Sequence, residues 1–241
     1  MHEDPVESAN PLVYSSPLIH ERRRRILKET RRLISEKGLA NFGIRELCKR
    51  ADVAQRTLYN AFSSKERVAA MAIKEAFDEL RQSINYSTLA TTIEGLIDRA
   101  ITINTRNLKA KNYALAVATI YFSPTTPQDV WDMLRRMGTA GITELLESLA
   151  ASRQLEEWVD IDEVAINFSN LSYAIINEWC MGRLTDRDYL RRIVDALLLL
   201  LLSATKGKAR KTAEKMLHDI RASGALPKFP APPRRSKAIA A

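Results

Sequence analysis

Apolar residues recur every three or four positions along most of the chain, which is the spacing that gathers them on one face of an α-helix. Near the amino end Ile26, Leu33 and Ile34 share such a face, and Gly38 is well placed to end the helix. The pattern predicts a first helix over residues 20–37. The apolar–polar alternation typical of strands does not occur in the sequence, so we expect an all-α protein.

A second, short helix is predicted next. Its apolar residues stand at positions i, i+3, i+4 and i+7, namely Ile44, Leu47, Cys48 and Ala51. Gly43 is an acceptable N-cap, and the pattern breaks at Asp52, a residue type that tolerates tight turn geometry. A third short helix follows over about residues 54–60.

A long fourth helix begins after a capping signal. Ser63, with Glu66 three positions later, matches the pattern of a capping box, and the helix that it opens continues to about Asn85. Beyond Ser87 the helical signals are longer, and the prolines between Ser123 and Asp129 interrupt them. The further helices are predicted over residues 89–107, 110–122, 127–151, 161–181, 185–205 and 208–222.

The composition is that of a globular protein of one or two domains. The chain has 241 residues, 46% of them hydrophobic and 27% charged, with only 8 Gly and 9 Pro, which argues against extensive disorder. The longest apolar run, from Ala196 to Leu202, is too short to cross a bilayer. The acidic start MHEDPVESAN differs from a secretory signal. We therefore expect neither membrane insertion nor secretion.

Residues that would support catalysis or metal binding are scattered. Cys48 and Cys180 each lie within an apolar helical pattern, and the 3 histidines are far apart in the sequence. Neither a phosphate-binding GxxxxGK loop nor an HExxH motif occurs. We expect no enzymatic activity, no metal and no cofactor, and we expect a reducing, cytoplasmic environment.

The net charge of +8 is unevenly distributed along the chain. Residues 20–67 hold 14 Lys and Arg against 6 Asp and Glu, a net charge of +8, and residues 204–241 hold 10 against 2. Residues 68–203 hold 13 against 18 and are therefore acidic. Two basic segments around an acidic body indicate a polyanionic partner at the ends, with solvated charge as the alternative.

The third predicted helix has a polar side with no packing role. Val53, Leu58 and Phe62 can hold this helix against the first two. The opposite side carries Gln55, Arg56, Thr57, Tyr59 and Asn60. Arg, Gln and Asn side chains suit base edges, and the hydroxyls of Thr and Tyr suit phosphate oxygens. Two short helices joined by a tight turn, after a longer helix, are a helix-turn-helix candidate.

A family resemblance supports this interpretation. The stretch RRRRILKETRRLISEKGLANFGIRELCKRADVAQRTLYNAFSSKERV, Arg22 to Val68, resembles the DNA-binding region of the tetracycline-repressor (TetR) family of bacterial transcription regulators. The matching features are the basic first helix, Gly38, the segment IRELCKRADV and the pattern TLYxxFxSKE, all without a gap. The sequence departs from the family at Asp52, where a turn glycine is usual, and at Arg56, which replaces a glycine that commonly approaches the DNA backbone. Phe42 and Gly43 stand where capping hydroxyl residues are common.

The candidate DNA contacts combine this resemblance with the outward polar side. The resemblance assigns phosphate contacts to Tyr59 and Lys65, and Lys65 also lies at a helix start, where free N–H groups favour a phosphate. The full candidate set is Arg22, Arg23, Arg45, Ala54, Gln55, Arg56, Thr57, Tyr59, Asn60 and Lys65. Each of these side chains has a plainer alternative as a solvated or half-buried surface residue.

The resemblance also implies that the remaining helices form an effector-binding and dimerisation domain. Dimerisation has a physical reason too, because one helix-turn-helix buries little surface and specific sites usually consist of two half-sites. The apolar helices predicted over residues 161–181 and 185–205 are the candidate interface of a homodimer, as part of a four-helix bundle. The alternative is that they are internal helices of a monomer.

An effector cavity would need apolar and aromatic walls with a few polar groups. The candidate residues are Tyr113, Tyr121, Phe122, Trp131, Met137, Phe168, Tyr173 and Asn177. Ordinary core packing is the alternative for all of them. No charged cluster is evident in the sequence, so a small, largely apolar effector is expected, acting by shifting the population of dimer conformations.

The sequence therefore predicts four segments: an N-terminal extension (1–19), a helix-turn-helix domain (20–67), an effector-binding and dimerisation domain (68–222) and a basic, Pro-rich tail (223–241). Both ends are expected to be disordered. The predicted function is that of a dimeric repressor that binds a palindromic operator in double-stranded DNA and is released by an effector. The alternative is a nonspecific, nucleoid-type DNA-binding protein that uses both basic ends.

Overall fold

The computed structural model describes residues 17–230, and within them the fold is all-α with ten helices. The helices are α1 (Pro17–Asn41), α2 (Ile44–Ala51), α3 (Gln55–Phe62), α4 (Lys65–Ser83), α5 (Ile93–Asn107), α6 (Lys111–Phe122), α7 (Gln128–Ala151), α8 (Ile161–Cys180), α9 (Asp186–Ala204) and α10 (Gly207–Ser223). The all-α prediction is confirmed. Within residues 17–230, one isolated antiparallel β-bridge joins Leu155 and Thr205. No helix in this part of the chain has the length and apolar character needed to cross a membrane.

The first helix differs from its predicted bounds at both ends. It begins at Pro17, so residues 17–19 of the expected extension are helical, and residues 1–16 lie outside the described range. Gly38 has φ 74°, a left-handed conformation that interrupts the helix where a stop was predicted. A short continuation then carries the chain to Asn41.

The cap of α4 lies one residue later than the sequence predicts. Ser64 is the N-cap, because its Oγ accepts a hydrogen bond from the backbone N–H of Arg67 at 3.1 Å. Ser63 has φ 65° and instead ends α3, with its N–H bonded to the carbonyl of Tyr59 at 2.8 Å. The predicted N-cap at Ser63 is therefore wrong by one residue, although the predicted fourth helix is present.

The fifth helix is shorter than predicted. It begins at Ile93 rather than at residue 89, because Thr92 caps it by accepting a hydrogen bond from the N–H of Gly95 at 3.0 Å. The preceding residues form a turn in which the N–H of Thr92 donates to the carbonyl of Leu89. The segment between α4 and α5 is thus a structured connection rather than helix.

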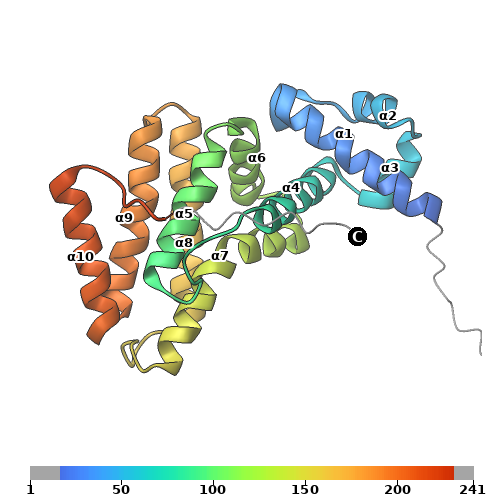
Figure 1. Ribbon diagram of the computed structural model, residues 1–241. Coiled ribbons are helices and arrows are strands. Elements are labelled where there is room, and N and C mark those ends of the chain that lie inside the picture. Colours follow the sequence, from blue (N-terminus) through green and yellow to red (C-terminus); the bar gives the residue numbers. More distant parts are fainter. Residues whose placement is uncertain (1–16, 231–241) are drawn as a thin grey trace, which may run out of the picture.

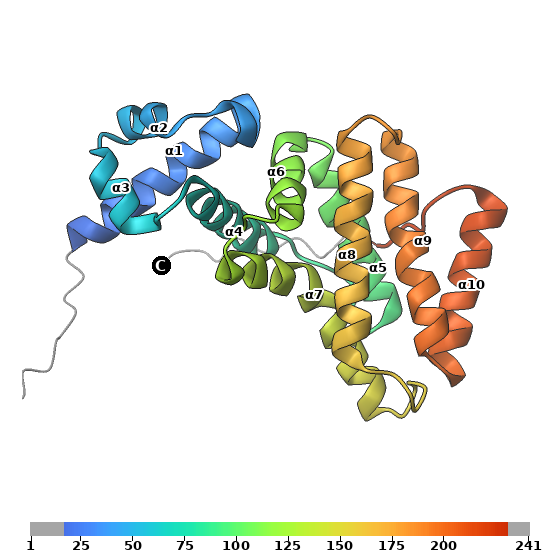
Figure 2. The ribbon, with the colours of Figure 1, turned by 180° about the vertical axis from the view of Figure 1, so that it is seen from behind.

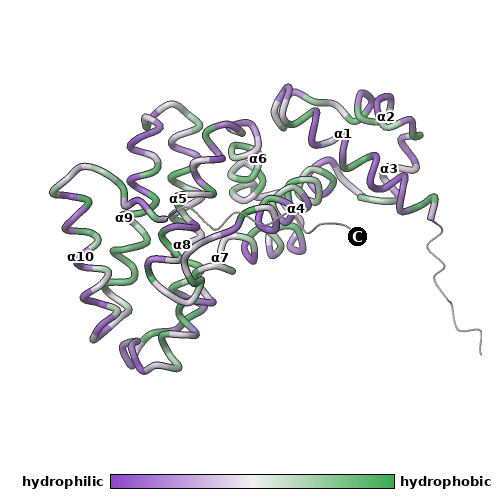
Figure 3. The backbone as a smooth tube through the Cα atoms, in the orientation of Figure 1, coloured by the Kyte–Doolittle hydropathy of each residue, from purple (hydrophilic) through white to green (hydrophobic). Residues whose placement is uncertain are grey.

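The helices are arranged in two groups along the molecule (Figure 1). Helices α1–α3 lie together at one end, and α4 leads from them into the body. Helices α8 and α9 run side by side in the body, and α10 packs on the outer side of α9 (Figures 1 and 2). Hydrophobic and hydrophilic residues alternate along the helical tubes in Figure 3, as expected when each helix buries one side.

Two hydrophobic cores hold these helices. The first is continuous from Ile26 and Leu33 of α1, through Ile73 of α4, to Tyr189 and Ile193 of α9. The second joins α5, the later part of α7, the early part of α8, α9 and α10. Because the first core contains residues of both groups, the helix-turn-helix end is packed against the body rather than joined to it by a free linker.

The chain after α10 also follows the body. Leu226 and Phe229 pack against the second core, and the hydroxyl of Ser87 donates to the carbonyl of Pro230 at 2.8 Å. These contacts differ from the disorder expected for residues 223–241, because two apolar side chains in this segment find a partner surface. The part of the expected tail beyond residue 230 lies outside the described residues.

Candidate nucleic-acid interface and ligand cavity

Helix α3 is held by one side and exposes the other. Leu58 and Phe62 are almost completely buried, and Val53 packs against the same core. The opposite side is open: Ala54, Gln55, Arg56 and Asn60 are exposed, Tyr59 is 46% exposed and Thr57 is half-buried. The predicted direction of this polar side is therefore found in the structure, and it leaves the side chains free to enter a major groove.

The turn before α3 depends on a residue in the left-handed region. Asp52 has φ 50° and ψ 60°, and its N–H bonds to the last turn of α2. From α1, the Nε of Arg25 donates to the carbonyl of Ala51 at 2.7 Å and its Nη2 donates to the carbonyl of Asp52 at 3.3 Å. A cation at the carboxyl end of a helix is stabilising. Arg25 therefore fixes the angle between α2 and α3.

The neighbouring arginines of α1 have different surroundings. Arg22 is exposed. Arg23 is half-buried, its guanidinium lies 4.8 Å from the centre of the Phe62 ring, and it donates to Sδ of Met71 at 3.1 Å. Arg23 thus packs against the core side of α3, which competes with its predicted role as a DNA contact.

Lys65 and Arg45 flank α3. Lys65 is the first residue of α4, as predicted, and its Nζ lies 4.7 Å from the centre of the Phe42 ring. That contact holds the ammonium group beside the helix start, where unpaired N–H groups favour an anion. Arg45 is exposed on α2. Both cations can therefore meet the phosphates that border a groove occupied by α3.

The charges around α3 differ from those on the rest of α1 and α2. Arg50 pairs with Glu36 and Glu46, at 2.8 and 2.9 Å, and Lys37 pairs with Glu46 at 2.8 Å. The hydrogen bond from Lys37 is the main reason why the pKa of Glu46 is lowered. By contrast, within residues 17–230 no carboxylate pairs with the guanidinium groups of Arg22, Arg45 and Arg56. These three unpaired guanidinium groups lie on α3 itself and on the two helices packed beside it.

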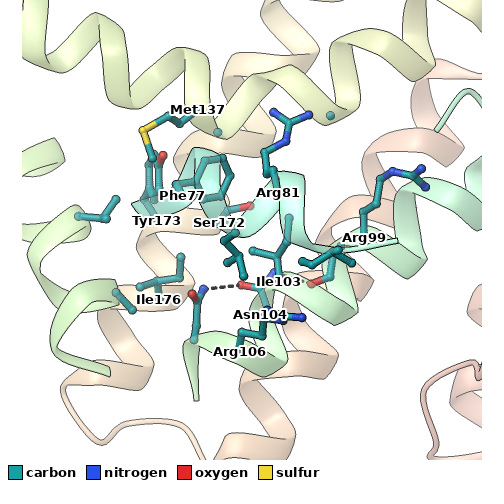
Figure 4. A pocket seen from close by; sticks show the side chains of 18 of the residues that line it. Phe77, Arg81, Arg99, Ile103, Asn104, Arg106, Met137, Ser172, Tyr173 and Ile176 are labelled. Carbon is teal, nitrogen blue, oxygen red and sulfur yellow. Dashed lines mark hydrogen bonds between the residues drawn. The ribbon is translucent and has the colours of Figure 1, made fainter. Parts of the chain in front are cut away.

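A cavity of about 670 Å³ lies in the body between α4, α5, α6, α7 and α8. That volume is in the range of sites for small molecules. Four of the eight residues predicted for an effector site line it: Tyr113, Met137, Phe168 and Tyr173. Figure 4 shows Met137 and Tyr173 on one side of this space, with Ile176 below them.

The other four predicted residues do not line this cavity. Tyr121 is buried, stacks on Trp131 with ring centres 5.6 Å apart, and donates to Oδ1 of Asn170 at 2.6 Å. Phe122 is 51% exposed, and Asn177 follows the lining residue Ile176 on α8 without lining the cavity itself. The aromatic residues at the end of α6 and the start of α7 form a cluster behind the lining residue Tyr173, whose ring centre lies 4.5 Å from that of Tyr121, so the cavity is lined by four of the eight predicted residues.

Sequence reasoning missed the wall that α4 and α5 contribute. The residues of this wall include Phe77, Leu80, Arg81, Tyr86, Arg99, Ile103, Asn104, Arg106 and Asn107. Asn104 and Asn107 both hydrogen-bond the hydroxyl of Tyr189, which holds α5 against α9. The apolar residues of α4 and α5 could have indicated a cavity wall, but the same pattern is equally typical of a packed helix.

Two hydrogen bonds join the cavity wall to the helix-turn-helix end. The hydroxyl of Tyr113 donates to the carbonyl of Arg31 at 2.7 Å, and Nδ2 of Asn112 donates to the carbonyl of Ser35 at 2.8 Å. Burial raises the pKa of Tyr113 to about 12, although the charge of Arg31 acts in the opposite direction. The phenol is therefore a neutral donor at physiological pH, and the cavity wall is connected directly to α1.

The described residues contain no group of three or more His, Cys, Asp or Glu side chains that is arranged to hold a metal ion. The site is a cavity with apolar walls and hydrogen-bonding groups, together with a separate exposed polar helix. Such an arrangement can bind ligands.

Comparisons with known proteins agree with this architecture. A family model described as bacterial regulatory proteins, tetR family, matches residues 26–70. A TetR transcriptional regulator from Rhodococcus sp. RHA1 has 20% sequence identity and a TM-score of 0.57, and the match covers 76% of this chain and 97% of that one. No curated protein sequence matches the chain.

Two further solved structures are similar. TylP, a TetR regulator from Streptomyces fradiae, has 20% identity and a TM-score of 0.54 over 86% of this chain and 100% of its own. SmeT, the repressor of the Stenotrophomonas maltophilia multidrug efflux pump SmeDEF, has 17% identity and a TM-score of 0.56 over 78% and 92%. The family model covers the helix-turn-helix end, residues 26–70, and these solved structures share the fold of most of the chain.

Proposed function

We propose that this regulator is a homodimeric repressor that binds a palindromic operator through α3 and is released when a small molecule enters the cavity of the body. The family consists of regulatory proteins, which agrees with the expectation that the chain is not an enzyme. The observation that carries the DNA-binding part is the exposed polar side of α3, with unpaired cations beside it. The name of the similar protein SmeT, a repressor, supports the direction of regulation.

In this proposal the residues of α3 have separate roles. Gln55, Arg56 and Asn60 are exposed and read base edges, and Tyr59 and Lys65 hold phosphates. Alanine at Tyr59 and Lys65 is expected to weaken binding to every DNA sequence. Alanine at Arg56 is expected to alter sequence preference, because a base contact discriminates among sequences and a phosphate contact does not.

The dimer in this proposal uses α8 and α9. Helix α8 packs against α6, α7 and α9, and Figure 2 views it from a side on which no other helix is drawn in front of it. Leu171 of α8 is 44% exposed and Leu199 of α9 is 48% exposed. Large apolar side chains exposed on two adjacent helices are typical of an interface that a second copy covers.

The test of the dimer is the oligomeric state of a charged variant. Leu171→Glu and Leu199→Glu place charges on exposed positions, so each variant is expected to fold and to sediment as a monomer, whereas the unaltered protein sediments as a dimer. Gln82→Glu, at an exposed polar position of α4 outside the proposed interface, serves as a comparison for charge alone. A monomeric unaltered protein would contradict this part of the proposal.

The operator is tested by selecting genomic DNA fragments with the purified protein. The expected result is a small set of fragments that share a palindrome with half-sites about 34–36 Å apart, or a multiple of that distance. Fragments without a shared sequence, together with affinity that falls steeply with salt, would favour the nucleoid-type alternative. A Tyr59→Ala, Lys65→Ala double variant should lose the enriched fragments, and normal operator affinity in that variant would refute the contact assignment.

A further inference from the structure

The cavity has an uneven distribution of charge. Of its charged lining residues, three are arginines, Arg81 from α4 and Arg99 and Arg106 from α5, and one is a carboxylate, Glu144 from α7. Figure 4 shows Arg81 and Arg99 on the side away from Met137 and Tyr173. The expectation of a largely apolar effector rested on the lack of a charged cluster in the sequence, and the folded chain forms such a cluster from residues 25 positions apart.

None of these arginines has a carboxylate partner within the part of the chain that the structure describes. Arg99 donates to neutral oxygens, the carbonyls of Gly95 and Thr88 at 2.9 and 3.1 Å and the hydroxyl of Thr88 at 3.3 Å, and its guanidinium lies 4.3 Å from the centre of the Tyr86 ring. The guanidinium of Arg81 lies 5.9 Å from the centre of the Phe77 ring. Ring faces and neutral oxygens orient a guanidinium without neutralising its charge, so each can still bind an anion.

Arg81, Arg99 and Arg106 line the same side of the cavity, which α4, α5 and the segment between them form. Burial raises the pKa of Tyr86, and Arg99, Arg106 and Arg81 each act to lower it, while the negative charge of Asp98 adds to the rise. Tyr86 also lines the cavity, and among the three guanidinium groups that of Arg99 is in contact with its ring.

The rest of the wall is apolar. Phe77, Ile103, Met137, Phe168 and Ile176 contribute carbon and sulfur surface. Glu144, Arg81 and Arg106 are exposed and Arg99 is half-buried, so water screens the one carboxylate and two of the three arginines alike, and the balance of charge stays positive. A molecule that matches this cavity has one negatively charged group and a hydrophobic body.

We propose that the cavity binds a small amphiphilic anion, with its acidic group beside Arg81, Arg99 and Arg106 and its apolar body against α7 and α8. This inference rests on the proposed role of the cavity as the effector site and names the chemical class of the effector. An acidic group at the arginines contacts α4, the helix that continues into the helix-turn-helix end, and so places the ligand where it can influence α4.

Two fluorescent probes of nearly identical shape test the proposal. 8-Anilinonaphthalene-1-sulfonate carries a negative charge, and N-phenyl-1-naphthylamine is the same molecule without the sulfonate. Each is titrated into the full-length protein. The charged probe is expected to bind roughly tenfold more tightly, and its binding should weaken as salt is added.

The variants then locate the charge effect. Arg81→Gln with Arg106→Gln is expected to remove the roughly tenfold preference while leaving the neutral probe bound, and Arg81→Lys with Arg106→Lys should retain most of it. Arg99 is left in place because it also holds Thr88. Arg183→Gln with Arg221→Gln, two exposed arginines outside the cavity lining, removes the same charge elsewhere and should leave the preference unchanged.

Ile103→Trp fills the cavity and identifies the binding site of the probes. Both probes are expected to lose binding in this variant. If both bind in the cavity with equal affinity, or if the Gln variant keeps the preference, the anionic class is refuted while the cavity remains an effector site. If both probes bind the Ile103→Trp variant as well as the unaltered protein, the cavity is not where they bind, and this proposal fails together with the effector part of the proposed function.

Discussion

The hydroxyl of Tyr113, a residue of the cavity wall, donates a hydrogen bond to the main-chain carbonyl of Arg31 in α1 at 2.7 Å. Arg31 itself pairs with Glu75 and Glu79 of α4, so one residue of α1 contacts both α6 and α4. A ligand that displaces Tyr113 therefore acts on the helix that supports α2 and α3. The bond is a direct physical connection between the two proposed binding sites.

Tyr113→Phe removes this bond and keeps the shape of the ring. The free energy of unfolding is expected to fall by about 1 kcal/mol, which urea unfolding measures. The factor by which a cavity ligand changes the operator Kd should shrink, because the connection to α1 is lost. Tyr121→Phe removes a comparable bond, to Oδ1 of Asn170, outside the cavity lining and should lower stability without changing that factor. An unchanged factor in Tyr113→Phe would assign the coupling to other contacts.

The buried tyrosines predict a loss of stability at alkaline pH. Burial raises the pKa of Tyr113 from 10.0 to about 12, and burial also raises that of Tyr173. The unfolded chain then releases these protons at a lower pH than the folded chain, so their stabilising effect is complete below about pH 10 and is lost as the pH rises toward 12. Between pH 9 and about 11, Tyr113→Phe should lose less stability than the unaltered protein. If urea unfolding shows that both proteins lose the same free energy of unfolding over this pH range, the prediction is contradicted.

Arg22 and Arg25 lie one helical turn apart on α1, and replacing them should affect different properties of the protein. Arg25→Gln removes two hydrogen bonds to the end of α2 and is expected to lower the free energy of unfolding by about 1 kcal/mol. Arg22→Gln should leave stability unchanged, since Arg22 is exposed, and should reduce the salt dependence of DNA binding by about one phosphate contact. Thermal unfolding and salt titrations of operator affinity separate the two effects.

Two glycines of α7 form a matched pair. A Cβ at Gly138 would lie 2.3 Å from Oγ and 3.2 Å from Cβ of Ser169, whereas at Gly141 the nearest atom would be Cδ1 of Leu96, at 3.6 Å. Gly138→Ala is expected to lower the free energy of unfolding by about 1–3 kcal/mol, because α7 and α8 must move apart. Gly141→Ala should raise it by up to about 1 kcal/mol through helix propensity. A stabilised Gly138→Ala protein would show that Ser169 rotates away without cost.

Much of the helix-turn-helix end could be predicted from the sequence because its determinants are local. The apolar spacing of α2, the turn at Asp52 and the outward side of α3 each depend on residues within one or two helical turns. The TetR resemblance, carried by the same residues, is confirmed by the family model over residues 26–70. The slip from Ser63 to Ser64 has a local cause as well: two adjacent serines compete to cap α4, and Ser63 is needed to end α3.

The cavity could not be predicted in the same way, because its walls come from distant segments. Arg81 and Arg99 belong to different helices, and only the packing of α4 against the body and of α5 against α9 places them beside one space. Arg23 shows the same limit, since its contact with Phe62 spans 39 positions and changes the surroundings of a side chain that the sequence presents as free. Aromatic content alone marked α6–α8 but could not separate the Tyr121–Trp131 stack from the cavity.

The continuous core between α1 and α9 bears on how this protein can be recombined with proteins of the same fold. A chimera cut at residue 67 would detach Val68, Ala72 and Ile73 from the partners that bury them on both sides of the junction. A chimera that retains α4 through Ser83 keeps these side chains packed against α1. The foreign domain must then supply the contacts that α6 and α7 make with α4. The segment suited to exchange between proteins is therefore α1–α4. The surface of α4 that faces the new domain would have to be redesigned so that the two pack together.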